Sequence, residues 1–336
     1  MSGYNTTFGE FARRTIHLLV CSPLSFLHVC LSFALLLSVS AFADLASAEL
    51  SDEALAKEGF ESIRIASYNL NNYLIMDRRV DGTWMRQYPK PELEKQSIQA
   101  ILLQVQPDIL VVQEIGGAAF LNELCDDLSR AGLEYPHSIL MEGSDTVRQT
   151  AVLSRFKPRY INKHDDLEYA YFDRKERLKR GLLEVGFVQG IPFTLFSVHL
   201  KSRFSKDKRD RLSAQWRLKE AEVCRNRILK RVDTKKINHY CIIGDFNDNP
   251  NSAVMRRFYK RGDRVIGRQL LAEDSRGETW TYLYEKERVY STVDGFVLSP
   301  ELFNYVDLGS ATIWDRPEAE LGSDHRLVYF DLSPPK

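Results

Sequence analysis

The sequence predicts an α/β domain in which mixed β-sheets are layered against helices. Short apolar runs rich in Val, Ile, Phe and Tyr recur along the chain and stop at Gly, Asn, Asp or Pro, as strands do. Segments with helical periodicity lie between them, but the alternation is irregular. Two strand-like runs follow one another within 182–198 with little helix between them. We therefore expect hairpins and mixed sheets instead of a repeated βαβ unit.

The expected elements follow from these patterns in chain order. Strands are predicted at 63–68, 109–113, 151–153, 182–187, 193–198, 240–243, 293–298 and 327–332. Helices are predicted at 98–105, 122–130, 210–232 and 252–261. The first helix has apolar residues at Ile98, Ile101, Leu102 and Val105, and Pro107 ends it.

The composition is that of a globular protein with one sizeable domain. Apolar residues make up 44% of the 336 residues and charged residues 27%, which excludes a disordered chain, a collagen-like repeat and a polytopic membrane protein. The 46 basic and 46 acidic side chains give a net charge of zero. No Pro/Gly/Ser-rich linker, low-complexity tract or internal repeat interrupts the sequence after the first 48 residues, which favours a single domain.

Residues 1–48 differ from the rest of the chain. Arg13 and Arg14 precede an uncharged run at 16–43, and residues 46–48 have the small-x-small pattern of a signal-peptidase site. We interpret 1–48 as a cleaved signal peptide, 49–61 as a short extension and 62–336 as the functional domain, in a secreted or periplasmic protein. An uncleaved membrane anchor is the alternative, because the uncharged run is long enough to span a bilayer.

Three cysteines follow the leader, and they indicate neither a disulfide framework nor a zinc site. Cys125, Cys224 and Cys241 are odd in number and form no C-x-x-C motif, so at most one disulfide is expected. Cys241 lies within an apolar strand pattern, where a small core residue is expected.

Most of the expected strands end at a residue that can bind metal or phosphate or move a proton. These residues are Asn69, Glu114, His199, Asp245 with Asn247, Asp294 at the start of its strand, and Asp324 with His325 before the last strand. Each alone has an ordinary structural explanation, such as a cap or a loop hydrogen bond. Together they indicate one site. Carboxylates and amide oxygens suit Mg²⁺, with Mn²⁺ as the alternative, and do not suit zinc.

Six motifs then carry a family resemblance. They are S-Y-N-L-N (67–71), V-V-Q-E (111–114), S-V-H-L-K-S (197–202), G-D-F-N-D (244–248), V-D-G-F-V-L-S (293–299) and G-S-D-H-R-L-V (322–328). In this order the chain resembles the endonuclease/exonuclease/phosphatase superfamily over about 62–333, with secreted bacterial nucleases of the deoxyribonuclease/exonuclease III type as its nearest kind. The resemblance implies a four-layered α/β/β/α sandwich and metal-dependent hydrolysis of a phosphate ester by in-line attack of water.

The resemblance also implies a role for each motif residue. Glu114 is the principal metal ligand, with Asn69 and Asp324 at the same metal site. Asp245 orients or deprotonates the water, and Asn247 holds the phosphate or that water. His199 contacts the scissile phosphate, while Asp294 and His325 form a carboxylate–imidazole pair. Arg180, Lys201 and Arg203 are the candidate phosphate-binding cations.

Two positions depart from parts of the family. Apurinic endonucleases have an acidic residue two positions after the first-motif Asn, whereas this chain has Asn71, which argues against an abasic-site activity. The catalytic tyrosine of the family has no clear match, and Tyr169 and Tyr171 are the candidates.

The charge distribution favours a nucleic-acid substrate. Residues 171–268 contain 25 Lys and Arg against 11 Asp and Glu, a net charge of +14 that the rest of the chain cancels. Segments 174–180 and 201–211 flank Arg180 and His199, where cations supply sequence-independent affinity for phosphates. A nuclease acting as a monomer, without a stable protein partner, is the first hypothesis. The alternatives are a phosphodiesterase or phosphatase for lipid headgroups or small metabolites, and a binding protein on an inactive fold. A sphingomyelinase would need an exposed apolar hairpin, and the sequence after residue 48 shows no such run.

Overall fold

The computed structural model describes residues 62–334, which belong to one compact unit of the chain. The predicted signal peptide or anchor (1–48) and the extension (49–61) lie outside the described residues. Within 62–334, none of the helices is long and apolar enough to cross a membrane.

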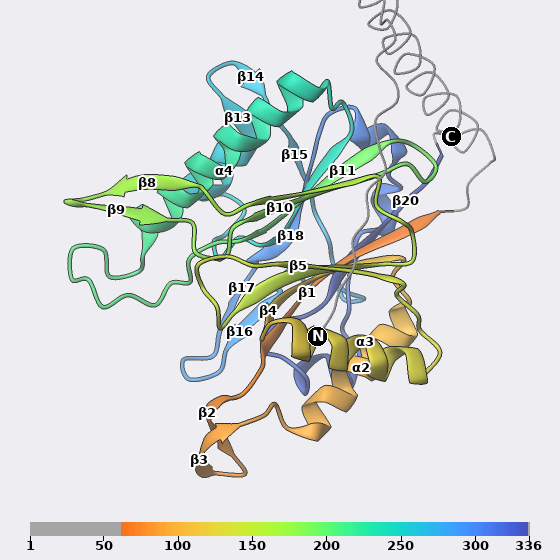
Figure 1. The fold of residues 1–336 in the computed structure, drawn as a ribbon, viewed down its shortest axis with the longest axis vertical. Helices are drawn as coiled ribbons and strands as arrows, with labels where there is room; N and C mark the ends of the chain where they lie inside the picture. The colour runs from red at the N-terminus through yellow and green to blue at the C-terminus, as the bar shows by residue number, and fades with distance from the viewer. Residues whose placement is uncertain (1–61, 335–336) are drawn as a thin grey trace, which may run out of the picture. The chain divides into compact units, whose positions relative to one another are not determined.

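Two six-stranded mixed sheets form the centre of the structure (Figure 1). The first sheet has the order β19-β20-β1-β4-β6-β5, with β19 (Thr312–Ile313), β20 (Val328–Leu332), β1 (Ile63–Tyr73), β4 (Ile109–Ile115), β6 (Gln149–Ser154) and β5 (His137–Met141). The second has the order β15-β18-β12-β11-β10-β7, with β15 (Arg268–Leu270), β18 (Asp294–Leu298), β12 (Tyr240–Asp245), β11 (Phe193–His199), β10 (Leu182–Phe187) and β7 (Tyr160–His164).

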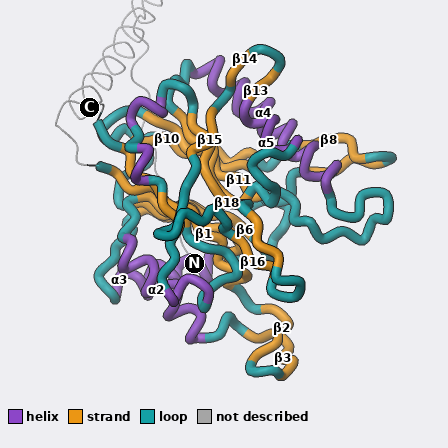
Figure 2. The backbone as a smooth tube through the Cα atoms, turned by 180° about the vertical axis from the view of Figure 1, so that it is seen from behind, coloured by secondary structure: helices purple, strands orange, loops and turns teal. Residues whose placement is uncertain are grey.

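Helices cover the outer face of each sheet, as both views show (Figures 1 and 2). Helices α2 (Glu92–Val105) and α3 (Ala118–Arg130) pack on the first sheet, and α4 (Ala214–Lys235) and α5 (Ala253–Tyr259) pack on the second. Three large apolar cores result within 62–334, and a small fourth cluster contains Tyr169, Tyr171 and Trp216. One lies between the sheets and includes Val111 and Ile243, one lies under α2 and α3, and one lies under α4 and α5. The predicted four-layered α/β/β/α sandwich is confirmed.

Four two-stranded hairpins and three short 3₁₀ segments complete the fold. The hairpins are β2 (Met76–Val80) with β3 (Thr83–Tyr88), β8 (Glu168–Tyr171) with β9 (Arg174–Arg177), β13 (Lys260–Arg261) with β14 (Arg264–Val265), and β16 (Tyr282–Tyr284) with β17 (Val289–Ser291). The 3₁₀ segments are η1 (Leu302–Tyr305), η2 (Leu308–Ser310) and η3 (Pro317–Glu320). The β2–β3 and β8–β9 hairpins project from the body of the molecule (Figure 1).

All eight predicted strands are present, but the predicted helix boundaries are wrong by up to six residues. Helix α2 begins at Glu92 instead of 98, α3 begins at Ala118 instead of 122, and α4 ends at Lys235 instead of 232. The helix expected to begin at 210 begins at Ala214, because the Asp210 carboxylate accepts hydrogen bonds from the backbone N–H groups of Gln215 and Trp216 and caps the helix from outside. The helix expected to reach 261 ends at Tyr259, where β13 begins. All three described cysteines are free, and Cys241 is a buried core residue as predicted.

Candidate active site

The register of the second sheet aligns three of the predicted site residues at one edge. His199 ends β11 and lies opposite Asp245 at the end of the parallel strand β12. Asp245 in turn lies opposite Asp294, which begins the antiparallel strand β18. All three are buried. Three residues far apart in the sequence therefore lie in a row across three neighbouring strands.

The first sheet contributes Asn69 from β1 and Glu114 from β4. The pairing of these strands shifts register between Asn69 and Tyr73, and Glu114 has a positive φ of 61°. Such an irregularity re-aims a side chain at the end of a strand. The Asn69 amide donates a 3.0 Å hydrogen bond to Asp245 Oδ2, which joins the two sheets at the site.

Asp245 is held by three donors. Asn69 and Asn247 Nδ2 each lie 3.0 Å from Oδ2, and the Asn247 backbone N–H donates to Oδ1 at 2.8 Å. Asn247 also donates to the Leu200 carbonyl. Asn247 therefore orients Asp245. This positioning role is additional to the contact with the phosphate or the water that the resemblance predicts.

Asp294 and His325 form the predicted carboxylate–imidazole pair. His325 Nδ1 lies 2.8 Å from Asp294 Oδ2, and both side chains are buried. The Ser323 hydroxyl accepts from the His325 backbone N–H and donates to the Asn69 carbonyl, which fixes the loop before β20 to the first sheet. The imidazole therefore faces the site in one orientation, with Nε2 left for a ligand.

Burial and neighbouring charges shift the pKa values of the titratable groups in the site in different directions. Burial, followed by the negative charge of Asp294, raises the pKa of Asp245 to about 7. Burial alone would lower the pKa of His325, but the charge and hydrogen bond of Asp294, with the charges of Asp245 and Asp324, raise it to about 10. Burial and the nearby cations, Arg180 first, hold the pKa of His199 well below its usual range. His325 is thus a cation and His199 a neutral imidazole near pH 7.

The donor set fits a hard divalent cation. Within 62–334, Asp245, Asp294 and His325 offer one ligand atom each within 4.8 Å of one another. Asp294 Oδ1 is buried and has no hydrogen-bond partner, so it is an open acceptor. Burial raises the pKa of Asp324, and the charge of Glu114 adds to that rise while the charge of His325 opposes it. Oxygen-rich clusters of this kind suit Mg²⁺ or Mn²⁺.

The three predicted phosphate-binding cations take different positions. Arg180 is buried close to His199, pairs with Asp145 at 3.3 Å, and has no hydrogen bond at its buried Nε. The ammonium of Lys201 donates to the backbone carbonyls of Ser202 and Phe204 in its own loop. Arg203 donates to Ser291 and Asn249. Arg180 is therefore best placed to meet a phosphate at His199.

Two site residues have no counterpart in the sequence prediction. Arg148 Nε donates to Asn72 at 2.7 Å and lies 3.8 Å from Glu114 Oε2. The Tyr282 ring lies 4.7 Å from the His325 ring. Arg148 lies three residues before the predicted strand at 151–153, so its place near a strand end was the one available signal. Tyr282 lies in a short hairpin without a strand pattern.

The candidate tyrosines Tyr169 and Tyr171 are engaged elsewhere. The Tyr169 hydroxyl donates to Glu220 and the Tyr171 hydroxyl to Asp210, both at 3.1 Å. Burial followed by Asp210 raises the pKa of Tyr171 to about 12. Both hydroxyls therefore anchor the β8–β9 hairpin to buried carboxylates.

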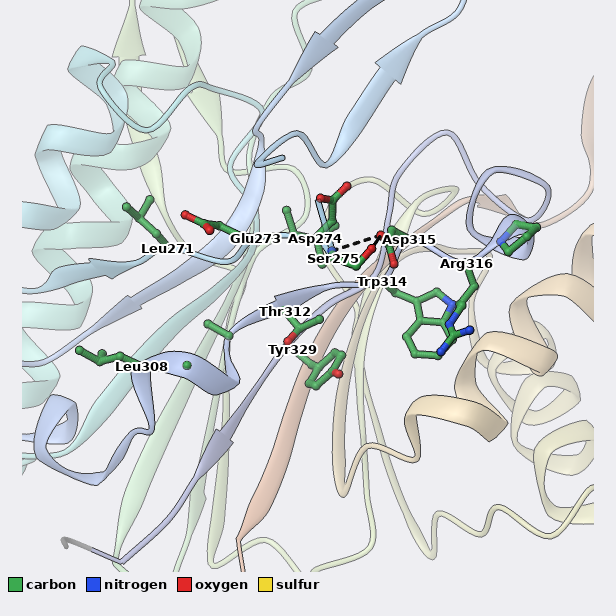
Figure 3. Close-up of a pocket in the computed structure, with 14 residues that line it drawn as sticks. Leu271, Glu273, Asp274, Ser275, Leu308, Thr312, Trp314, Asp315, Arg316 and Tyr329 are labelled. Carbon is green, nitrogen blue, oxygen red and sulfur yellow. Dashed lines mark hydrogen bonds between the residues drawn. The ribbon is translucent and has the colours of Figure 1, made fainter. Parts of the chain in front are cut away.

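A cavity of about 860 Å³ lies apart from these residues (Figure 3). It is lined by residues from the segment after β15, from η2, from β19 and the segment after it, and from β20, and it includes none of the candidate site residues. Its Asp315 accepts hydrogen bonds from the backbone and hydroxyl of Ser275, and Asp274 is paired with Arg326. Since these carboxylates are already engaged, we place the chemistry at the strand ends and not in this cavity.

Comparisons with known proteins identify the family of the chain and its fold. A model of the endonuclease/exonuclease/phosphatase family matches residues 66–325. A search of the curated proteins finds no match. Similar solved structures include a family protein from Leptotrichia buccalis (14% identity, TM-score 0.56, covering 80% of this chain and 99% of that chain). They also include sphingomyelinase C from Streptomyces griseocarneus (14%, 0.53, 81% and 100%) and a 3′ phosphatase from Neisseria bound to a product DNA hairpin (17%, 0.50, 80% and 99%).

Proposed function

The chain belongs to the endonuclease/exonuclease/phosphatase family, and we propose that it is a Mg²⁺-dependent nuclease that cleaves phosphodiester bonds of nucleic acid. Family membership makes it a phosphoester hydrolase. The solved structures that it resembles act on different esters and show the fold alone, so the choice of substrate depends on this chain's own residues.

The chemistry that we propose uses groups already described. Asp245, with a pKa near neutrality, accepts a proton from the attacking water. His325, protonated beside Asp294, and neutral His199 donate hydrogen bonds to phosphate oxygens. Asp245, Asp294, Glu114 and Asp324 are the residues that would hold the divalent cation. When bound, it supplies charge neutralisation at the phosphate.

One observation carries the choice of nucleic acid. Residues 171–268, which include Arg180, His199 and Lys201, carry a net charge of +14. Burial first, and then the positive charge of Arg180, lower the pKa of Lys201 to about 8. A polyanionic strand relieves such repulsion, and each phosphate contact strengthens binding.

A substrate panel tests the proposal. Plasmid DNA, single-stranded DNA, RNA, sphingomyelin vesicles and inositol phosphates are incubated with Mg²⁺ or with a chelator. We expect cleavage of nucleic acid only, its loss with chelator, and a fall in rate of about 10²–10⁴-fold for Asp245→Ala. Asp331→Asn, which removes a carboxylate paired with Arg64 at the opposite end of β1, is the matched control and should keep full activity.

A second candidate, a phosphodiesterase for lipid headgroups, is favoured by one feature that the sequence did not reveal. The projecting β2–β3 hairpin exposes Trp84 to 64% and Met85 to 37%, next to Arg79 and Arg86. Aromatic and basic side chains together suit a membrane interface. Headgroup release from vesicles, lost in Trp84→Ala, would establish this candidate in place of the nuclease.

A further inference from the structure

The β8–β9 hairpin and the loop 201–213 form a rigid projection, which we call the arm (Figures 1 and 2). Buried Glu220 of α4 ties its parts together. Glu220 accepts from the hydroxyl of Tyr169 and the indole N–H of Trp216 at 3.1 Å each, and from the backbone N–H of Lys201 at 2.6 Å. Asp210 makes a second anchor through Tyr171 and the Trp216 backbone. Glu220 of α4 and Asp210 of the loop thus join the hairpin, the loop and the start of α4, which holds the arm surface in a fixed shape.

The arm encloses a pocket of about 400 Å³ lined chiefly by Arg174, Lys201, Phe204, Lys206, Asp207 and Trp216. The Arg174 guanidinium lies 5.3 Å and the Lys201 ammonium 5.9 Å from the Trp216 ring centroid. Asp207 is the one carboxylate in the lining, and Arg209 neutralises it through contacts of 2.8–3.3 Å. Lys206 forms no ion pair within 62–334. The pocket is therefore net positive.

Phe204 is an exposed aromatic in this cationic setting. Its side chain is 71% exposed, and no aliphatic residue lines the pocket with it. A membrane-binding surface would instead present a contiguous apolar patch. An aromatic ring beside cations is the arrangement that binds a base together with its phosphate.

The pocket is also close to the candidate active site. Lys201 follows His199 by two residues, and the charge of Arg180 acts on both. A strand whose scissile phosphate lies at His199 would place a neighbouring nucleotide at the arm.

Resting on the proposed nuclease function, we propose that the arm pocket binds one unpaired nucleotide next to the scissile phosphate, with its base stacked on Phe204 and its phosphate on Arg174 and Lys206. The base must be unpaired, because in a duplex its faces are covered by its neighbours. The enzyme therefore prefers single-stranded or frayed nucleic acid over duplex.

Fluorescence anisotropy of labelled oligothymidylate and of a hairpin duplex of equal length, with chelator to prevent turnover, tests this assignment. Phe204→Ala should lower the affinity for the single strand about 10-fold, as expected for one lost stack, and leave duplex affinity and the salt slope unchanged. Arg174→Ala should reduce the slope of log affinity against log salt by about 0.7 for the single strand. Trp84→Ala, an exposed aromatic on the β2–β3 hairpin, is the matched control and should change neither.

Three results would overturn the assignment. The first is that Phe204→Ala has no effect on single-strand affinity, and the second is that it weakens duplex and single-strand binding equally. The third is that Phe204→Ala abolishes binding to sphingomyelin vesicles and leaves binding to the oligonucleotide unchanged. Hydrolysis of bis(p-nitrophenyl) phosphate with Mg²⁺ separates this question from the proposed function. An unchanged rate in Phe204→Ala, with an unchanged thermal midpoint, locates the effect in strand binding. If the unmodified protein hydrolyses no phosphodiester, the proposed function fails while the binding result stands.

Discussion

Two buried histidines of the site differ in protonation state, since His325 is a cation and His199 is neutral. The difference arises from the groups around each ring. Burial alone would lower the pKa of His325, but the charge and hydrogen bond of Asp294 raise it. Burial and then the charge of Arg180 lower the pKa of His199, even though its Nε2 lies 3.6 Å from Asp245 Oδ2. Environments that push titratable groups apart in this way mark the acid and base roles of an active site. The pair Asp294–His325 is the centre of this arrangement, because Asp294 raises the pKa of both His325 and Asp245.

Replacing Asp294 by Asn should move the whole pH profile of kcat/KM to lower pH. The protonated His325 is lost as pH rises through its pKa, and without the Asp294 charge that pKa falls, so the alkaline limb moves down. Asp245 works deprotonated, and its pKa falls for the same reason, so the acid limb also moves down. A neighbouring charge is worth about 1–3 pKa units. Rates on a small phosphodiester across pH measure both limbs. Limbs that stay in place, or an acid limb that moves to higher pH, would contradict the assigned roles, and Asp331→Asn should leave both limbs unchanged.

Sequence reasoning reached the site residues that stand at strand ends and missed those that do not. His199, Asp245 and Asp294 were predictable because strand ends in a packed sheet meet at one edge, and their register brings them into line. The direction of a side chain was not predictable. Lys201 was expected at the phosphate, but its ammonium turns to the carbonyls of its own loop. Arg148 reaches the site through its contact with Asn72, a pairing across 76 residues that no local pattern encodes.

At the scale of elements, buried strands were predicted and projecting hairpins were not. Strands such as β12 are continuous apolar runs because both faces are covered. The strands β8 and β9 are short and charged, and they pair outside the two main sheets. Their pairing depends on the anchors at Glu220 and Asp210, which are tertiary contacts. The hairpins that flank the site therefore became visible only in three dimensions.

Gly244 shows how one element sets the geometry of the site. It has a φ of 138°, and a Cβ atom built on it would lie 2.0 Å from the Val198 carbonyl oxygen. This close approach of β12 to β11 places Asp245 beside His199.

Gly244→Ala should lower the free energy of unfolding by about 2–5 kcal/mol, because of the clash and the strained backbone. Denaturant unfolding measures it. Gly295, its partner on β18, has open space around its Cβ position, so Gly295→Ala is the control and should change stability by less than about 1 kcal/mol. Equal losses in both would show that the approach is not the constraint.

At the scale of the whole molecule, a net charge of zero conceals an uneven distribution of charge along the chain. Positive charge is concentrated in 171–268, which includes the arm and α4, and the compensating negative charge lies elsewhere in the chain. Net charge describes solubility, whereas the local field at a cleft governs the encounter with a polyanion. The four carboxylates of the site, Glu114, Asp245, Asp294 and Asp324, outnumber the cations paired with them, His325 and Arg148, which leaves negative charge for a bound cation to neutralise.

The site therefore couples metal binding to the stability of the sandwich. Glu114 comes from the first sheet, Asp245 and Asp294 from the second, and Asp324 from the loop before β20, so a cation held among them links elements that otherwise meet here through the Asn69–Asp245 hydrogen bond. Binding to the folded state alone stabilises it by about 2.7 kcal/mol at a hundredfold excess over Kd, or about 5–10 °C in the thermal midpoint for a domain of this size.

Thermal unfolding with Mg²⁺ and with chelator should show this rise, and Glu114→Gln should remove most of it. Glu142→Gln, which removes an exposed carboxylate paired with Lys163, should keep it in full. A rise that survives Glu114→Gln would mean that the cation is held by Asp245 and Asp294 without the first sheet, and the two sheets would then be joined at the site by hydrogen bonds alone.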